Sequence, residues 1–480
     1  MNDRKGFGSN FGFLMAAVGS AVGLGNIWGF PNKMGANGGF PFLILYLALA
    51  LCCGVIIMLG ELALGRKTGH GAVGAYQSIS KRFKWLGWLG IAAAALIFSF
   101  YSALGGYCLR YVVVNFGNLI GAEFGTNGVG GADVFQGLLS QPDVSIAFAL
   151  AFMLITMLVV MSGVGGGIER VCSVGMPALF FILIICIIRS CTLPGAADGL
   201  KYMFVPGWSV ANGIIDEAPS FWKVLTAAGG QMFFSLSLGA GVMITYGSYL
   251  DKKQDLGKSA MIIVGMDTVV ALMAGLCVIP GRFALDPSGD LGGPELLFIT
   301  MQNVFDKMGP AGPVFGILFY LLVFFAAISS SISMLEVIVA HFCDKAREKG
   351  KGDRRKLYSA IVVVICAALC ALVCADGMGS NHISPAELLG LAGAKLPGWS
   401  TSWLGLFDSV AEGLLMPLGA LLMCLMISWE LKPDTLRQEI LLNGENRPWV
   451  YDFFRLCVKY ITPLCMLMIL YGQISDFFIV

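Results

Sequence analysis

The chain has 480 residues, of which 57% are hydrophobic and only 13% are charged. Its mean hydropathy of +0.79 is far above that of a water-soluble domain, so the composition excludes an ordinary soluble protein and indicates a polytopic membrane protein. The net charge of +1 offers no basic excess for nucleic acid. The 14 cysteines lie mostly in apolar runs, where cysteine acts as a small hydrophobe, and predict no disulfide framework.

Eleven apolar segments are long enough to cross a membrane, which predicts an all-α polytopic fold in one domain, 1–480. The predicted spans are 11–35, 40–65, 85–118, 145–162, 168–191, 220–250, 257–283, 311–343, 357–375, 403–431 and 448–475. Lysine and arginine are roughly threefold more frequent in the segments on the N-terminal side than on the other side. The positive-inside rule therefore predicts a protein of the cytoplasmic (inner) membrane with a cytoplasmic N-terminus and an extracellular or periplasmic C-terminus.

Spans one and six are both interrupted near the middle by small residues, SAVGLGN at 20–26 and SLSLGAG at 235–241. The two lie five spans apart, and because five is odd they would enter the membrane from opposite sides. This predicts an inverted five-helix repeat, 11–191 and 220–431, followed by an extra span at 448–475. Paired broken helices of this kind point to a substrate site at the middle of the membrane.

A helix break frees backbone carbonyls and amides inside the bilayer, where each is costly unless it is paired. Freed carbonyls favour a cation, and the amino-terminal end of a half-helix favours a carboxylate. The alternative is that the glycines serve only helix packing, which is common in membrane helices. Asn26 at membrane depth, Pro31 after it and the matching break in span six weigh against that alternative.

Further polar side chains fall at membrane depth, where ionisable groups are functional candidates because lipid solvates them poorly. They include Asp267, Asp408, Glu412 and the serines of AAISSSIS at 326–333. A single serine usually bonds to its own helix, but four serines within five positions exceed that need.

Together these motifs resemble the neurotransmitter:sodium symporter family, in its bacterial eleven-helix subgroup that includes the bacterial leucine transporter. The resemblance covers nearly the whole chain. Its most specific stretches are GSAVGLGNIWGFP (19–31), NGGFPFLILY (37–46), GELALGR (60–66), GQMFFSLSLGAGVMITYGSYL (230–250) and FFAAISSS (324–331). The resemblance implies sodium-coupled symport of an amino acid by alternating access, so the expected partners are an amino acid as the small-molecule substrate, sodium and the lipid bilayer.

The resemblance also implies two sodium sites built from hard oxygen donors, as a hard cation demands. The first would use the Ala21 carbonyl, Asn26, Ser235, Asp267 and the substrate's own carboxylate. The second would use the carbonyls of Gly19, Val22 and Ala326 and the hydroxyls of Ser329 and Ser330. Animal members need chloride near the first site, where they have asparagine in place of Asp267. The fixed charge of Asp267 therefore predicts chloride-independent transport with no cofactor other than sodium.

The substrate class follows from one glycine. Gly23 stands where monoamine transporters of the family have an aspartate, so the carboxylate should come with the substrate, which favours an amino acid. By resemblance, the backbone of Ala21, Leu24 and Gly25 and the hydroxyl of Tyr101 would surround that carboxylate. The other implied substrate-binding residues are Ile97, Phe234, Ser235, Ser237, Ala240, Ser330 and Met334. This set is mostly apolar, which favours a hydrophobic side chain. Ala240 replaces a phenylalanine of the leucine transporter, so the pocket should be larger, and a bulky hydrophobic or aromatic amino acid is expected.

The resemblance places an inner gate at Arg4 and Asp344, with Phe7 in place of the usual tryptophan. At the outer gate, Asp408 matches the family's acidic partner. The sequence WGFP, however, places Gly29 where most members have an arginine. The sequence therefore predicts an ordinary inner gate and an altered outer gate.

Two more acidic residues have predicted roles. Glu412 could pair with Arg110 or Lys33, carry a proton, or bind a cationic substrate. Glu61 is expected to accept hydrogen bonds from the unwound part of span six and to support the site, with Gln231 and Tyr46 in the same network.

Other function classes fit less well. An enzyme is not expected, because the glycine pairs follow no strand and the three histidines fall in different segments. A channel is disfavoured by the paired gates. A non-transporting amino-acid sensor on the same fold is the main alternative.

Overall fold

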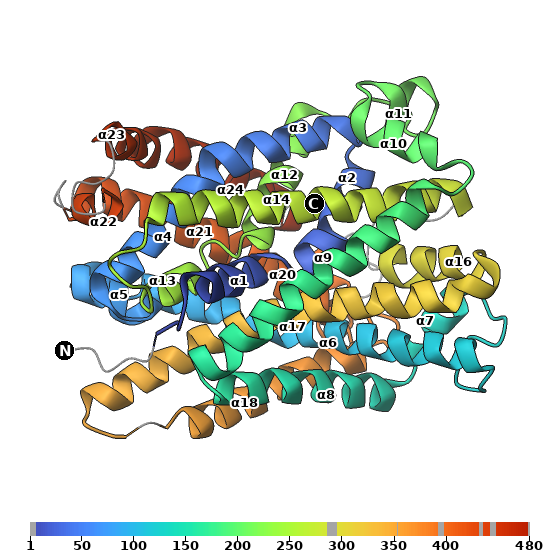
Figure 1. Cartoon of the computed structure of the whole chain (residues 1–480), viewed down its shortest axis with the longest axis horizontal. Coiled ribbons are helices and arrows are strands. Elements are labelled where there is room, and N and C mark those ends of the chain that lie inside the picture. Colours follow the sequence, from blue (N-terminus) through green and yellow to red (C-terminus); the bar gives the residue numbers. More distant parts are fainter. Residues whose placement is uncertain are drawn as a thin grey trace.

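The computed structural model describes residues 6–285, 295–352, 354–391, 398–431, 435–441 and 448–478. Within these residues the chain is a bundle of long helices that run roughly along one axis, and no strand is found among them (Figure 1). The predicted all-α architecture is therefore confirmed for the described part of the chain.

Nine helical stretches in this part of the chain are long and apolar enough to cross a membrane. They are Phe40–Thr68, Lys81–Ile120, Pro142–Met161, Val164–Cys191, Leu256–Leu285, Gly309–Glu348, Arg355–Asp376, Trp403–Glu430 and Pro448–Ser475. A tenth is the pair α1 (Asn10–Ala21) and Gly25–Ala36, which bend by 46° at their break. The latter half comprises the π-helical turn η1 (Gly25–Gly29) and α2 (Phe30–Ala36).

The predicted sixth span takes the form of two short helices, α12 (Phe221–Ser235) and α13 (Val242–Gly247). Leu236–Gly241 separate them without regular helix. The described residues thus contain nine of the eleven predicted spans as long helices and the first span as a bent pair. The predicted sixth span is not among them, because six residues separate α12 from α13, and the count of eleven is not confirmed.

The helices that build the site are α3 (Phe40–Leu49), α4 (Val55–Thr68), α6 (Leu86–Ile120), α14 (Leu256–Leu285), α17 (Gly312–Glu348), α20 (Trp403–Val410) and the π-helical turn η8 (Ala411–Leu415). Around them lie α8 (Pro142–Met161), the π-helical turn η4 (Val164–Ile168), α9 (Glu169–Cys191), α18 (Arg355–Asp376), α21 (Met416–Leu425), α23 (Pro448–Leu456) and α24 (Thr462–Phe478). Shorter helices at the two ends include α5 (Ala72–Ile79), α7 (Gly131–Leu139), α10 (Ala196–Phe204), α11 (Trp208–Ala211), α16 (Met301–Asp306) and α22 (Arg437–Ile440).

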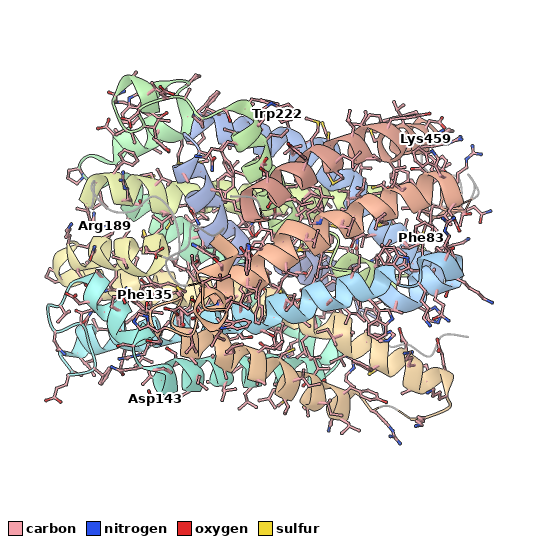
Figure 2. The ribbon with its side chains drawn as sticks, turned by 180° about the vertical axis from the view of Figure 1, so that it is seen from behind. Phe83, Phe135, Asp143, Arg189, Trp222 and Lys459 are labelled. Atoms are coloured by element: carbon pink, nitrogen blue, oxygen red, sulfur yellow. The ribbon has the colours of Figure 1, made fainter. Side chains whose placement is uncertain are left out.

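The bundle has a buried centre and an apolar outside. α6 and α17 pack against each other in the centre, whereas α8, α9 and α18 lie at the periphery. Large apolar side chains on these outer helices are exposed, such as Phe181 at 71% and Val364 at 69%, as expected for surfaces that face lipid. Charged side chains lie towards the two ends, with Asp143 and Arg189 at one end and Lys459 at the other (Figure 2).

Two ends of the bundle are distinguished below. The N-terminal end carries α5 and α22, and the opposite end, here called the α10 end, carries α10, α11 and α7 (Figure 1). Each broken helix has one half pointing to each end. The α2 half points to the α10 end, where the Tyr202 hydroxyl of α10 donates to the Gly35 carbonyl at 2.5 Å.

Gly65 permits the closest approach between α4 and the half-helix α13. A Cβ at this position would lie 2.0 Å from the carbonyl oxygen of Ile244 and 2.9 Å from the backbone nitrogen of Ser248. Because backbone cannot move aside as a flexible side chain can, α13 is held against α4 only if residue 65 has no side chain.

Gly65→Ala should therefore destabilise the fold by about 1–3 kcal/mol through overpacking. The measurement is the midpoint of thermal unfolding of the detergent-purified protein. Gly175→Ala on α9 is the matched control, since no atom lies within 4 Å of a Cβ there. Equal midpoints for the two variants would contradict the packing described.

Candidate substrate and ion site

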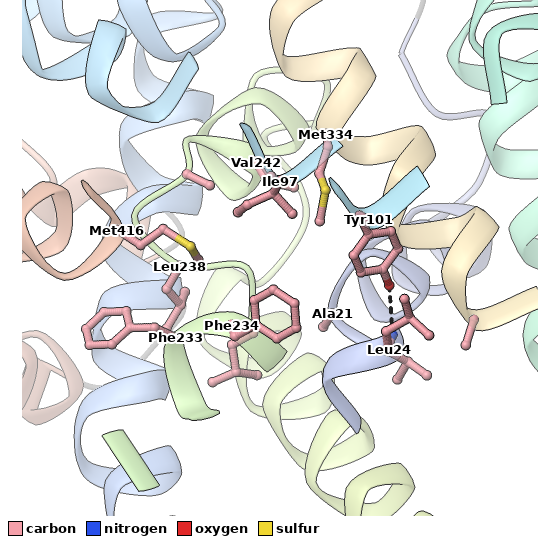
Figure 3. Close-up of a cluster of buried hydrophobic side chains, with 14 of the residues drawn as sticks. Ala21, Leu24, Ile97, Tyr101, Phe233, Phe234, Leu238, Val242, Met334 and Met416 are labelled. Carbon is pink, nitrogen blue, oxygen red and sulfur yellow. Dashed lines mark hydrogen bonds between the residues drawn. The ribbon is translucent and has the colours of Figure 1, made fainter. Parts of the chain in front are cut away.

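The first helix break frees backbone amides from the helical pattern, and two of them find side-chain partners nearby. α1 ends at Ala21, and Val22 is extended with φ −74° and ψ 104°. The amide of Gly23 donates to Oδ1 of Asn26 at 2.9 Å. The amide of Leu24 donates to the Tyr101 hydroxyl of α6 at 2.7 Å (Figure 3). The break thus places the amides of Gly23 and Leu24 in the protein interior, close to the hydroxyl of Tyr101.

The carbonyls freed by the same break converge on two serines of α17. The Ser330 hydroxyl lies 3.4, 3.1 and 3.3 Å from the carbonyl oxygens of Gly19, Ser20 and Val22. The Ser329 hydroxyl lies 3.4 Å from the Val22 carbonyl and 2.9 Å from the Ala326 carbonyl on its own helix. The structure therefore brings together all five residues predicted for the second ion site, Gly19, Val22, Ala326, Ser329 and Ser330.

The second break has a left-handed backbone. Ser237, Gly239 and Gly241 have φ of +52°, +81° and +73°, and Ser237 is a non-glycine residue in a region that such residues rarely adopt. The Ser237 hydroxyl donates to the Ser20 carbonyl at 3.1 Å, so the two breaks face each other. As predicted, the Glu61 carboxylate of α4 accepts from the second break, through the Gly239 amide at 2.7 Å.

Asp267 of α14 is fully buried and joins four helical segments. Its carboxylate accepts from Nδ2 of Asn26 at 2.7 Å and from the Ser235 hydroxyl at 3.0 Å. The Tyr46 hydroxyl of α3 donates to it at 3.1 Å. Three residues of the predicted first ion site, Asn26, Ser235 and Asp267, thus lie together, and the fourth, Ala21, ends α1 at the adjacent break.

The Asp267 contacts correct one prediction. Tyr46 and Gln231 were expected beside Glu61, but Tyr46 bonds Asp267, and Nε2 of Gln231 donates to the Gly25 carbonyl at 2.6 Å. The reason is that two other buried groups need partners: Gln231 of α12 pairs with a carbonyl of the first break, and Tyr46 of α3 pairs with the Asp267 carboxylate. Tyr46 was missed as a partner of Asp267 because the two are far apart in sequence.

Apolar side chains surround the space beside the two breaks. Ile97 and Tyr101 come from α6, Phe234 from α12 and Met334 from α17, and all are at most 9% exposed. The rings of Tyr101 and Phe234 lie 6.5 Å apart between centroids, with Ala21 and Leu24 of the first break close by (Figure 3). Ala240, in the second break, is 2% exposed. These predicted substrate-site residues therefore gather from separate helices.

Gly23 has no room for a side chain. A Cβ at this position would lie 2.3 Å from the Ser330 hydroxyl and 2.5 Å from the Tyr101 hydroxyl. Gly25 is similarly confined, since a Cβ there would lie 3.0 Å from the Phe234 ring and 3.2 Å from the Ser235 Cα. Both glycines are thus required for the two breaks to approach each other and the phenol of Tyr101.

At the N-terminal end, the ring of Phe7 lies among three other rings. Its centroid is 5.5 Å from that of Phe13, 5.7 Å from Tyr246 and 6.2 Å from Tyr249. The predicted inner-gate residue Asp344 is 8% exposed, and one of its oxygens accepts from the Gly71 amide at 3.1 Å. Arg4, its predicted partner, lies outside the described residues.

Sequence reasoning missed a buried carboxylate at this end. Glu336 of α17 is fully buried, accepts from the Tyr249 hydroxyl at 2.6 Å and pairs with Arg355 of α18 at 2.5 Å. An acidic residue within a predicted span was the signal available for it. Because Tyr249 also contacts Phe7, Glu336 links the aromatic cluster to α18.

A second acid at this end fastens the start of α1. The Glu169 carboxylate, at the start of α9, accepts from the Gly8 amide at 2.7 Å and the Ser9 hydroxyl at 2.9 Å. A cavity of about 810 Å³ borders Gly8, Glu169, Asp344 and Arg355. None of its lining residues belongs to the two breaks, so the substrate-site residues lie apart from this cavity.

Towards the α10 end, Lys33 of α2 pairs with Glu412 of η8. This contact decides among the partners predicted for Glu412, because the Arg110 guanidinium instead lies over the Phe148 ring, 5.9 Å from its centroid. Asp408, one turn earlier on α20, has Glu412 and Lys33 as charged neighbours. The region predicted as the outer gate thus contains two acids and one lysine among the described residues.

Comparison with known proteins agrees with this geometry. The profile of the sodium:neurotransmitter symporter family matches residues 4–127 and 132–478. The sodium-dependent transporter YhdH of Bacillus subtilis is 36% identical over 479 residues, which is 97% of each chain. The sodium-dependent transporter MJ1319 of Methanocaldococcus jannaschii is 30% identical over 458 residues, covering 91% of this chain and 84% of that one.

Among solved structures, the crystal structure of MhsT in complex with L-phenylalanine matches 98% of this chain and 100% of its own. The TM-score is 0.83 and the sequence identity is 34%. The relatives are membrane-spanning sodium-dependent transporters and not enzymes. The paired helix breaks, the oxygen-lined clusters between them and the match along the whole chain together lead to one conclusion: this protein belongs to the sodium:neurotransmitter symporter family.

Proposed function

We propose that this protein is a symporter that couples the sodium gradient to uptake of a bulky hydrophobic or aromatic amino acid by alternating access. The observation that carries the proposal is the meeting of two broken helices at one buried place, with amides, carbonyls and the Asp267 carboxylate around it. The excess of lysine and arginine on the N-terminal side favours a cytoplasmic N-terminus, so the α10 end faces outwards. The two breaks then belong to inverted repeats, 11–191 and 220–431.

The substrate's carboxylate fits beside the first break. There the Leu24 and Gly25 amides begin the α2 half-helix, whose amino-terminal end attracts negative charge. The Tyr101 hydroxyl accepts from the Leu24 amide at 2.7 Å, and a phenol that accepts one hydrogen bond can still donate its own proton to a carboxylate oxygen. Because Gly23 has no side chain, the hydroxyls of Ser330 and Tyr101 come close to the first break, where that of Tyr101 can reach this carboxylate.

Two sodium ions fit the two oxygen clusters. The first would lie among the Ala21 carbonyl, Asn26, Ser235, Asp267 and the substrate carboxylate, so that ion and substrate bind together. A buried carboxylate such as Asp267 is costly without a cation or proton, which favours sodium there. The second ion would lie among the oxygens of Gly19, Val22, Ala326, Ser329 and Ser330, which are hard donors without net charge.

The apolar pocket supports a large side chain as substrate. Ile97, Phe234 and Met334 present apolar surface beside the breaks, and Ala240 occupies little of it. MhsT, the solved relative, was crystallised with L-phenylalanine. A cationic substrate whose charged group binds to Glu412 is disfavoured, because Glu412 already pairs with Lys33.

The proposal predicts sodium-driven accumulation of phenylalanine or a similar amino acid in proteoliposomes, tested with a panel of all amino acids. With a tenfold sodium gradient and ~100 mV, two sodium ions supply about 7 kcal/mol, enough for about a 10⁵-fold amino-acid gradient. One ion supplies only about 4 kcal/mol, or several hundredfold. Replacing chloride with gluconate should leave uptake unchanged.

A sensor on the same fold would give a different result in this assay. It would bind the amino acid in a sodium-dependent way but accumulate none inside the vesicles. Loss of uptake in gluconate would refute chloride independence while leaving sodium-coupled transport in place.

Gly23→Asp should abolish amino-acid uptake, because its carboxylate would occupy the space assigned to the substrate's carboxylate. Gly23→Ala is the steric control, since its Cβ meets the same two hydroxyls without adding charge. Binding assays in sodium should show that phenethylamine, which lacks a carboxylate, binds more tightly to Gly23→Asp than to Gly23→Ala. Unchanged amino-acid uptake in Gly23→Asp would refute the assigned carboxylate position.

Ala240→Phe should narrow the pocket and weaken uptake of phenylalanine and tryptophan by about tenfold relative to leucine, since a filled apolar pocket rejects larger side chains by about 1–3 kcal/mol. The readout is the ratio of kcat/KM values for the two substrate sizes. Ala240→Ser, which adds little volume, is the control. An equal loss for all substrates would mean that residue 240 does not determine substrate size.

A further inference from the structure

The contact between Lys33 and Glu412 lies between the first broken helix and the helix that carries the family's acidic gate residue. The Lys33 ammonium of α2 donates to Oε1 of Glu412 in η8. The Lys33 side chain is 25% exposed and that of Glu412 is 5% exposed, so one partner is nearly buried. An ion pair of this kind is screened less by water than a surface pair, and removal of one partner leaves a buried charge.

Glu412 sits in a niche that the neighbouring helices keep open. A Cβ at Gly230 of α12 would lie 3.0 Å from Oε1 of Glu412 and 2.2 Å from Nε2 of Gln473 on α24. The Gln473 amide is held in turn by the Thr226 carbonyl at 3.1 Å. The absence of a side chain at Gly230 therefore lets Glu412 reach Lys33 between α12 and α24.

At position 29, where most members of the family have an arginine, this protein has a glycine whose surroundings leave little room for a side chain. A Cβ at Gly29 would lie 2.8 Å from Oε1 of Gln231, and Nε2 of the same amide is held by the Gly25 carbonyl at 2.6 Å. A side chain at position 29 would have to displace this amide. Gln231 thus occupies the place from which an arginine would start towards Asp408.

Each charged position lies four residues further along the chain than its counterpart in the family, but the two helices run in opposite directions, α2 towards the α10 end and α20 to α21 away from it. Lys33 follows Gly29 by four residues and Glu412 follows Asp408 by four residues, which is about one helical turn in each case. A lysine on α2 leans back along its helix towards the break, because helical side chains point to the amino-terminal end. The flexible side chain of Lys33 can therefore reach the depth in the bundle at which the side chain of an arginine at position 29 would lie.

We propose that Lys33 and Glu412 form the ion pair that closes the substrate site on the α10 side, in place of an arginine at position 29 paired with Asp408. This inference rests on the proposed alternating-access function. When the pair forms, it ties the mobile half of the first broken helix to η8. When it breaks, α2 is released and the site opens to the outside. Asp408 is a second acid beside the same lysine and positions it.

The test compares release of bound phenylalanine from purified protein in sodium after dilution. Lys33→Gln and Glu412→Gln are expected to bind phenylalanine with sodium but to release it about tenfold faster than the unmodified protein, since the closed state loses its ion pair. The charge-swapped double variant, Lys33→Glu with Glu412→Lys, should return release towards the original rate. Asp408→Asn should have a smaller effect than Lys33→Gln.

Lys201→Gln is the matched control at the same end of the molecule. Lys201 pairs with Asp198 at 3.1 Å, but both side chains are about half exposed, so release should not change.

Two results would overturn the proposed gate. One is a release rate for Lys33→Gln equal to that of Lys201→Gln, and the other is a larger effect of Asp408→Asn than of Lys33→Gln. If Lys33→Gln does not fold, as judged by size-exclusion chromatography, Lys33→Arg and the charge-swapped variant are used instead. Both retain an ion pair and should release phenylalanine slowly, so fast release from both would overturn the proposed gate. Absence of sodium-dependent binding in the unmodified protein would instead refute the proposed function itself.

Discussion

The arrangement of this protein depends on how backbone groups are paired where two helices break inside the bundle. In a membrane, water is not available to pair them, so every freed amide and carbonyl needs a partner from the protein or from a ligand. At the first break the partners are Asn26, Tyr101 and two serines of α17. At the second break they include Glu61. Apart from Asn26, each of these partners comes from another helix, and the breaks therefore hold several helices together.

The same requirement explains why the candidate ion and substrate sites coincide with the breaks. Oxygens that pair with hydroxyl groups in one state can coordinate a cation in another, because both interactions use the same lone pairs. Asp267 is the carboxylate of the predicted first ion site, and it receives hydrogen bonds from three other helical segments. Substrate, sodium and helix position are thereby linked through a few shared atoms, which is the physical basis proposed for coupling.

The two ends of the bundle restrain the broken helices in different ways. At the N-terminal end, Phe7 lies in an aromatic cluster, Glu169 binds the start of α1, and Tyr249 connects to the Glu336–Arg355 pair. At the α10 end, the described contacts between α2 and η8 centre on one lysine and one buried glutamate. Several contacts restrain the N-terminal end, whereas one ion pair is central at the α10 end. The two proposed gates should therefore differ in how strongly a single substitution affects them.

The sequence by itself determined the all-helical membrane architecture, the positions of both breaks and the residues that surround them, because hydropathy, small residues and intramembrane polar groups are local signals. It also showed that Gly29 removes the expected gate arginine. It could not assign Tyr46 to Asp267, Gln231 to Gly25 or Lys33 to Glu412, since each pair joins helices far apart in the chain. It also missed Glu336 and Glu169, whose significance depends on partners from other segments. Only the tertiary structure decided these pairings, because a buried polar group bonds whichever neighbour the packing of the helices brings within reach.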